Sequence, residues 1–287
     1  MSRKIVLCIL SFLPILLLAQ ETSTLPAKEG QRGGSFYDTL VHRGIDAMSC
    51  DSLTKAENCF REAMRQEPTN AANVLLFRYL AQIQERQGRE QEALDSYTAG
   101  VNLSPKNLEM RLDRAALLFR MGNEQRALMD YTDVLDMQPE NIEALGMRAY
   151  IYAGQHNYKK ARDDYETLLK IDPMNEKARI GLILVNDRDN RSVEARRQID
   201  ALIEMHPDHA VLYAIRGGIE QRHRQYEMSL ADLSRAIELE PKNADYYVSR
   251  ATLYLEMGKR KLARQDVQEA VRLGADPREM ASMLKKD

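Results

Sequence analysis

Six prolines recur at an almost constant interval along most of the chain. They are separated by 37 residues once and by 34 residues each further time, at Pro68, Pro105, Pro139, Pro173, Pro207 and Pro241. The second residue after each proline is an asparagine, except after Pro207, where it is His209. A fixed period of this length is typical of proteins built from stacked structural repeats.

Each period contains two segments with helical spacing. Apolar side chains recur every three or four residues over 108–119 and again over 127–135. Gly122 lies between these segments and supplies a turn, as Gly88 and Gly258 do in their own periods. The proline opens the next repeat, where its missing amide costs little. The period therefore predicts an all-α chain in which each repeat is a pair of helices.

The second segment of each repeat begins with a small residue that is followed four positions later by a larger one. In four repeats the pair is alanine and an aromatic residue: Ala56 with Phe60, Ala93 with Tyr97, Ala127 with Tyr131 and Ala161 with Tyr165. This pattern resembles the tetratricopeptide repeat family, whose signature ends in Ala, three residues, an aromatic residue and then Pro. The resemblance implies an all-α fold, a right-handed α-solenoid of stacked antiparallel helix pairs.

The resemblance covers nearly the whole chain after the first 36 residues. Residues 20–36 are expected to form a linker, residues 71–73 to lengthen one connection, and residues 278–287 to form a C-terminal capping helix. The seven expected repeats are 37–70, 74–107, 108–141, 142–175, 176–209, 210–243 and 244–277.

The first 19 residues differ in character from the rest. Arg3 and Lys4 precede an uncharged, mainly apolar run over 5–18 that ends before Ala19. A basic start, a short apolar run and a small residue indicate a signal peptide, and the run is too short for a comfortable membrane span. We expect cleavage after Ala19 and a periplasmic or secreted protein that is not integral to the membrane. The alternative is an uncleaved N-terminal anchor.

Cys50 and Cys59 are the cysteines that would remain after cleavage. Export makes a disulfide chemically possible. The repeat pattern, however, places Cys50 at the end of one helix and Cys59 well inside the next, which favours two free thiols. Both alternatives stay open at the level of sequence.

Four repeats carry an arginine and, sixteen residues later, an aspartate. We predict that each pair joins the two helices of its own repeat, because a partly buried arginine needs a carboxylate partner. The predicted pairs are Arg114 with Asp130, Arg148 with Asp164, Arg216 with Asp232 and Arg250 with Asp266.

Residue patterns that indicate catalysis are absent from the sequence. We find no phosphate-binding glycine loop, paired cysteine motif or nucleophile–base set, and we predict no enzyme and no cofactor. His206 and His209 flank a proline turn without a convincing third ligand, so no metal site is predicted. The formal net charge of −2 argues against binding to nucleic acid. Met121, Met137, Met205 and Met257 are expected to fill the core.

In tetratricopeptide repeat proteins the first helices of the pairs line an inner groove that commonly holds a peptide or a helix of a partner. The positions of this sequence that match the groove-facing phase give a basic edge for acidic groups of a partner, at Arg86, Arg120, Arg188 and Arg222. They also give an apolar anchor site at Phe119 and Tyr150. The partner-binding candidates are Arg78, Gln82, Arg86, Phe119, Arg120, Tyr150, Arg188 and Arg222.

Some family members capture an acidic C-terminus with a Lys/Asn clamp. Arg78 and Gln82 echo only the start of that clamp, and Asp113 stands where an Asn would be expected. The favoured function is therefore a non-catalytic protein–protein interaction scaffold or adaptor of the periplasm or cell envelope. The alternative is a binding subunit for a cell-wall or surface glycan, which the absence of tryptophan makes weaker. The sequence sets no oligomeric state and no partner identity.

Overall fold

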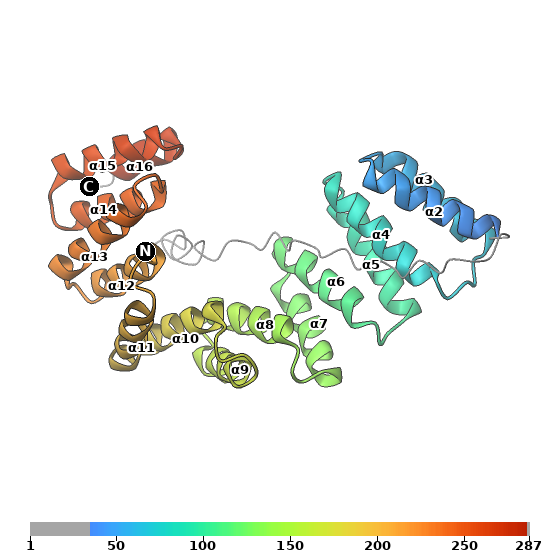
Figure 1. Cartoon of the computed structure of the whole chain (residues 1–287), viewed down its shortest axis with the longest axis horizontal. Helices are drawn as coiled ribbons and strands as arrows, with labels where there is room; N and C mark the ends of the chain where they lie inside the picture. The colour runs from blue at the N-terminus through green and yellow to red at the C-terminus, as the bar shows by residue number, and fades with distance from the viewer. Residues whose placement is uncertain (1–34, 286–287) are drawn as a thin grey trace. The chain divides into compact units, whose positions relative to one another are not determined.

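The computed structural model describes residues 35–285, which form α-helices joined by short turns and contain no strand (Figure 1). The predicted signal peptide (1–19) and most of the predicted linker (20–36) lie outside the described residues. The helices are α2 (Phe36–Ser49), α3 (Leu53–Gln66), α4 (Asn73–Arg86), α5 (Glu90–Leu103), α6 (Leu108–Arg120), α7 (Glu124–Met137), α8 (Ile142–Gly154), α9 (Tyr158–Ile171), α10 (Glu176–Arg188), α11 (Ser192–Met205), α12 (Ala210–Arg222), α13 (Tyr226–Leu239), α14 (Ala244–Glu256), α15 (Arg260–Arg272) and α16 (Pro277–Lys285).

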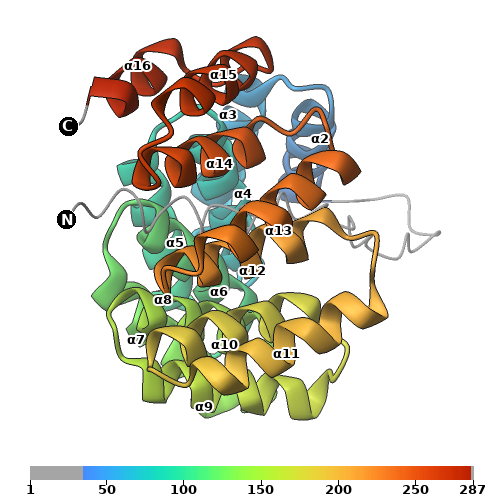
Figure 2. The ribbon, with the colours of Figure 1, turned by 90° about the vertical axis from the view of Figure 1, so that its left-hand side faces the viewer.

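Consecutive helices pack as antiparallel pairs, and each of the seven expected repeats contains one pair, from α2 with α3 to α14 with α15. The prediction of an all-α chain of stacked helix pairs is confirmed. We call the first helix of each pair its A helix and the second its B helix, and we number the repeats 1 to 7. The additional helix α16 packs against α15 and buries Met280 there (Figure 2).

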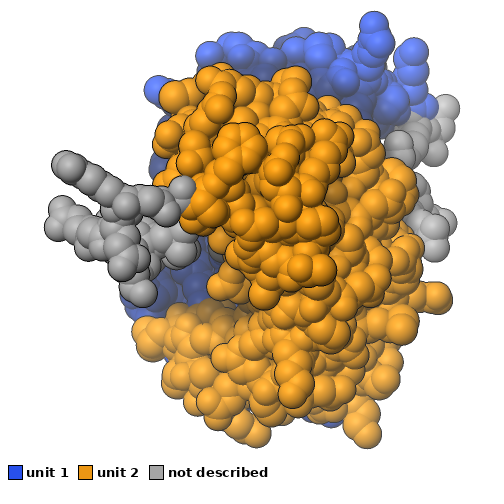
Figure 3. All heavy atoms as spheres, turned by 90° about the vertical axis from the view of Figure 1, so that its right-hand side faces the viewer, with its two compact units in different colours: residues 1–20, 176–287 blue, residues 21–175 orange. Residues whose placement is uncertain are grey.

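The described residues divide into two compact units at a repeat boundary (Figure 3). Unit 2 contains repeats 1 to 4 (35–175), and unit 1 contains repeats 5 to 7 with α16 (176–285). In unit 2, Phe60 and Ala56 of α3 pack with Leu40 of α2 and Leu76 of α4. In unit 1, separate clusters join α10 to α12, α12 to α14 and α14 to α16. These clusters bury apolar side chains both within a helix pair and between neighbouring repeats of the same unit, as expected for a stacked array.

The turn between the two helices of a pair needs one residue with a positive φ angle. The predicted glycines Gly88, Gly122 and Gly258 adopt φ values of 73°, 78° and 71°. The other four repeats place a residue with a side chain there, at φ values of 57° to 60°: Asp51, His156, Asn190 and Arg224. The positive φ angle therefore occurs at this turn in all seven repeats, although only three of them have glycine, the residue that adopts it most readily.

The asparagines that stand two residues after Pro105 and Pro139 have a local role at the start of the next helix. The side chains of Asn107 and Asn141 accept hydrogen bonds of 2.9 Å from the amides of Met110 and Ala144. They cap the N-termini of α6 and α8, where amides lack partners within the helix. The inserted residues 71–73 do not all lie in the connection, contrary to the prediction, because Asn73 is the first residue of α4. The Asn73 side-chain amide donates a 2.8 Å hydrogen bond to the Glu67 carbonyl.

The four predicted Arg–Asp pairs all occur within their own repeats. Each arginine donates two hydrogen bonds to its aspartate, with Nε–Oδ2 distances of 2.8, 2.8, 2.6 and 2.8 Å for Arg114, Arg148, Arg216 and Arg250. The aspartates are between 3% and 7% exposed. Two parallel bonds to one buried carboxylate fix the A helix against the B helix and offset the desolvation of both charges.

Repeats 1, 2 and 5 lack this ion pair. Repeats 2 and 5 have instead a neutral hydrogen bond one helical turn further along. The Ser96 hydroxyl lies 2.7 Å from the Gln84 side-chain amide in repeat 2. In repeat 5, Asn186 donates to Gln198 at 3.0 Å. Gln84 and Asn186 occupy the same position in their repeats and are 1% and 3% exposed. The polar bridge between the paired helices is thus retained in another chemical form.

Two expectations about sulfur-containing residues have different outcomes. Cys50 and Cys59 are both free thiols, the first exposed and the second buried. The expectation that Met137 and Met205 fill the core is wrong, because they are 41% and 49% exposed at the ends of α7 and α11. Their helical phase predicted side chains that point into the core. However, Met137 and Met205 are the last residues of α7 and α11, so no further helical turn packs over them.

Candidate functional site

The predicted partner-binding residues lie on A helices of both units. Six of them belong to unit 2, and Arg188 and Arg222 belong to unit 1. We call the surface formed by the six residues of unit 2, together with Glu109, Asp113 and Glu143, the A-helix face. These side chains come from α4, α6 and α8.

Phe119 of α6 and Tyr150 of α8 form an aromatic pair on the A-helix face. Their ring centroids lie 5.7 Å apart at an interplanar angle of 85°, an edge-to-face contact. Both side chains are partly buried, and burial followed by the charge of Glu124 raises the pKa of the Tyr150 hydroxyl. The predicted anchor residues are therefore brought together, and each leaves part of its ring accessible.

The predicted basic edge is largely neutralised by acids of the preceding repeats. Arg86 donates to Asp51 at 2.7 Å. Arg120 forms an ion pair with Glu85, which also accepts a 2.7 Å hydrogen bond from the Tyr97 hydroxyl. In each case the acid lies 35 residues before the arginine. These ion pairs join consecutive repeats, so the two guanidinium groups are not an unpaired positive surface.

Unit 1 repeats this arrangement at Arg222. Its guanidinium and the His223 ring both bind Asp187 of α10, whose side chain is fully buried, and the His223 Nε2–Asp187 Oδ1 distance is 2.7 Å. Arg188 is partly exposed, and no hydrogen bond or ion pair joins it to the described residues. The four arginines share one helical phase, but three of them link neighbouring repeats.

Arg78 lies in a separate group of charges on the A-helix face. It donates to Asp113 at 2.6 Å and also forms an ion pair with Glu109, and both acids are on α6. Burial opposes the charge of Arg78, but Asp113 and Glu109 raise its pKa overall. Gln82, one turn along α4, is partly buried and makes no hydrogen bond to another described side chain.

Two acids near Arg78, Asp113 and Glu143, have raised pKa values. Burial is the main cause at Asp113, where Arg78 acts in the opposite direction and Glu109 adds to the rise. Burial also raises the pKa of Glu143 on α8, followed by the charge of Asp113, and Arg78 partly offsets both. Three carboxylates thus act on one guanidinium. Glu109 and Glu143 were not among the residues predicted from sequence, although their 34-residue separation places them at the same position of successive repeats.

One more buried acid lies in unit 1. Glu220 of α12 is 2% exposed; its Oε1 atom binds Arg196 at 2.8 Å, and its Oε2 atom has no hydrogen-bond partner among the described residues. Burial, together with the charges of Asp232 and Asp200, raises the pKa of Glu220 to about 7 despite Arg196 and Arg216. The only indication of this residue in the sequence is a glutamate at a position of apolar helical phase.

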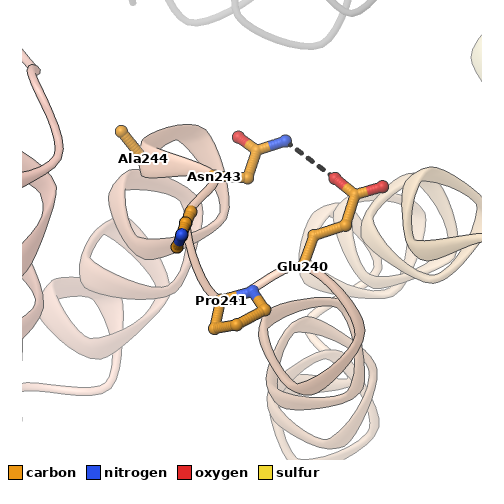
Figure 4. Close-up of a pocket in the computed structure, with 5 residues that line it drawn as sticks. Glu240, Pro241, Asn243 and Ala244 are labelled. Carbon is orange, nitrogen blue, oxygen red and sulfur yellow. Dashed lines mark hydrogen bonds between the residues drawn. The ribbon is translucent and has the colours of Figure 1, made fainter.

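A small hollow at the turn between α13 and α14 has no comparable set of groups (Figure 4). It is lined by residues 240–244, and Asn243 donates to Glu240 there at 3.1 Å. The Asn243 side chain also caps α14. The polar side chains that line the hollow therefore stabilise the turn and the start of α14.

Within residues 35–285, no group of three or more His, Cys, Asp or Glu side chains is arranged to hold a metal ion. None of the helices described is both long and apolar enough to cross a membrane.

The fold and the A-helix face define a helical-repeat protein in which the shared chemistry is packing and ion pairing between helices. Tetratricopeptide repeat family models match residues 43–107, 142–175 and 244–276. A tetratricopeptide repeat protein from Parabacteroides merdae is 30% identical, with a TM-score of 0.76 over 88% of this chain and 98% of that chain. The chain belongs to the tetratricopeptide repeat family.

Two further solved structures share the fold at lower identity. PilW, described as a type IV pilus biogenesis factor, is 14% identical, with a TM-score of 0.60 over 74% of this chain and 98% of that chain. PilF of Pseudomonas aeruginosa is 13% identical, with a TM-score of 0.53 over 73% of this chain and 95% of that chain. No curated protein matches the chain. Tetratricopeptide repeat proteins are generally non-catalytic scaffolds whose repeats bind other proteins.

Proposed function

We propose that this protein is a non-catalytic scaffold or adaptor of the periplasm or cell envelope, and that it binds a peptide or helix of a partner protein on the A-helix face. The observation that carries the proposal is the edge-to-face pair of Phe119 and Tyr150 on consecutive A helices. A partly exposed aromatic pair offers a large apolar contact area at a low cost in side-chain entropy, which suits an anchor for a partner side chain.

The cellular location in this proposal rests on the first 19 residues. Their basic start and short apolar run support export, with Gln20 as the first residue of the mature protein. N-terminal sequencing of the protein recovered from a periplasmic fraction tests this part. A chain that retains residues 1–19 and sediments with membranes would support the anchored alternative.

Binding is tested by retention of envelope proteins on the immobilised full chain. The test variant is Phe119→Ala with Tyr150→Ala, and the control is Met129→Ala, which truncates a side chain that is 67% exposed on the B helix α7. We expect a protein that is retained by the wild type and the control but reduced at least tenfold on the double variant. Retention on purified cell wall, with no protein recovered, would sink the scaffold proposal in favour of the glycan-binding alternative.

A further inference from the structure

The charges on the A-helix face of unit 2 do not balance. Arg86 and Arg120 are each matched by one acid, Asp51 and Glu85. Arg78 is the one base of the remaining group, and it faces Asp113, Glu109 and Glu143. The group therefore carries an excess of two negative charges when its acids are ionised.

This excess charge is accessible to a partner. The Glu109 side chain is 71% exposed although it binds Arg78. Glu143 is close enough to surrounding protein atoms for its pKa to rise, but it still presents an exposed surface to solvent. Asp113 is less accessible, with its side chain 26% exposed, and its ion pair with Arg78 holds the guanidinium in place. A cation arriving from solvent would meet Glu109 and Glu143 first, and it would not have to displace Arg78 from Asp113.

The acidic group lies at a defined distance from the aromatic pair. Glu143 and Tyr150 are seven residues apart on α8, so they share one side of the helix about 10 Å apart along its axis. An extended peptide advances about 3.3 Å per residue, so about three residues of such a peptide would cover that distance.

From this arrangement we infer that the A-helix face of unit 2 receives a cationic segment of a partner protein, in which a lysine or arginine lies about three residues from an apolar or aromatic side chain. The apolar side chain contacts Phe119 and Tyr150, and the cation lies between Glu109 and Glu143. This inference rests on the proposed function and reverses the sign of charge that the sequence pattern suggested. An acidic segment would approach uncompensated carboxylates, which is unfavourable.

The test is selection of a random linear peptide library on the immobilised full chain, followed by titration of labelled selected peptides by fluorescence anisotropy. The acidic group is neutralised in Glu109→Gln with Glu143→Gln. The matched control is Asp163→Asn with Glu166→Gln, which removes two negative charges from exposed positions on the B helix α9. Phe119→Ala with Tyr150→Ala reports on the anchor site.

We expect the wild type to enrich peptides with lysine or arginine three or four positions from an aromatic or large aliphatic residue. Their dissociation constants should rise about tenfold in the Glu109/Glu143 variant and less than twofold in the control. Binding should also weaken with added salt and at low pH, as the acids become protonated.

The outcomes separate this inference from the proposed function. The inference would be overturned if the enriched peptides were acidic or uncharged, or if basic peptides bound the Glu109/Glu143 variant as tightly as the wild type. Either result would leave partner binding on the A-helix face intact. Failure to enrich any peptide, or binding that is indifferent to Phe119→Ala with Tyr150→Ala, would overturn both.

Discussion

Glu220 shows how one residue can make stability depend on pH. Its carboxyl group is buried, one oxygen is ion-paired with Arg196, and the other has no hydrogen-bond partner among the described residues. Its pKa is raised to about 7. An unfolded glutamate titrates near pH 4.5. Between these values the folded state holds a proton that the unfolded state has lost, so this group lowers the stability as pH rises through that window. Above about pH 7 its cost is fully present.

Glu220→Gln should therefore stabilise unit 1 at pH 8, by about 2 kcal/mol in the free energy of unfolding. The amide can still accept from Arg196, which also binds Asp200 at 3.0 Å. The advantage should shrink as pH falls below 7 and be small near pH 5. Urea unfolding at pH 8, 6.5 and 5 measures it, with Glu204→Gln at an exposed position of α11 as the control. An advantage that is independent of pH would contradict the assignment.

At the scale of the helix pair, the ion pair and the neutral bridge are alternative solutions to one packing problem. Repeat 4 holds Arg148 and Asp164, whereas repeat 2 has Leu80 and Ser96 at the same positions. The Arg148 and Asp164 side chains are only 20% and 9% exposed, so removal of either partner leaves a poorly solvated charge.

We expect Asp164→Ser and Arg148→Leu each to lower the free energy of unfolding by about 2 kcal/mol, and the double variant to cost at least 1 kcal/mol less than their sum. A double-mutant cycle from urea unfolding measures this coupling. The exposed pair of Arg235 with Glu238, 3.2 Å apart, is the control and should show a coupling below about 0.5 kcal/mol. Additive effects at Arg148 and Asp164 would mean that the pair does not act as a unit.

At the scale of the whole molecule, the division at residue 175 coincides with the end of repeat 4. Contacts in a stacked array are local, so a fragment that ends between repeats keeps its helix pairs complete. We expect residues 35–175 to fold alone, with a helical circular dichroism spectrum and cooperative urea unfolding. A fragment of residues 35–155 ends after α8 and leaves it without α9, and it should be markedly less stable. Equal stability of the two fragments, or an unfolded 35–175, would contradict the division.

The features that could be predicted from sequence are those that repeat with the period or act within one repeat. The Arg114–Asp130 bond follows from its fixed spacing across a single turn, and Gly122 from the φ angle that the turn requires. The link from Arg120 to Glu85 could not be predicted in this way, because it depends on how one helix pair is placed on the next. For the same reason, the sequence predicted that Arg78 lies on the A-helix face but not that Glu109 and Asp113 of the next repeat neutralise its charge.

The links between repeats also restrict how such a chain can grow. Arg120 needs an acid at the position that Glu85 holds in the preceding repeat, but repeat 3 itself has Phe119 at that position. A tandem copy of repeat 3 would therefore place a guanidinium beside a ring instead of a carboxylate. Repeat 6 has the same limitation, because Arg222 binds Asp187 while its own equivalent residue is Gln221. Duplication of a single repeat would thus place a mismatched copy beside the original, so these repeats are not interchangeable although they share one shape.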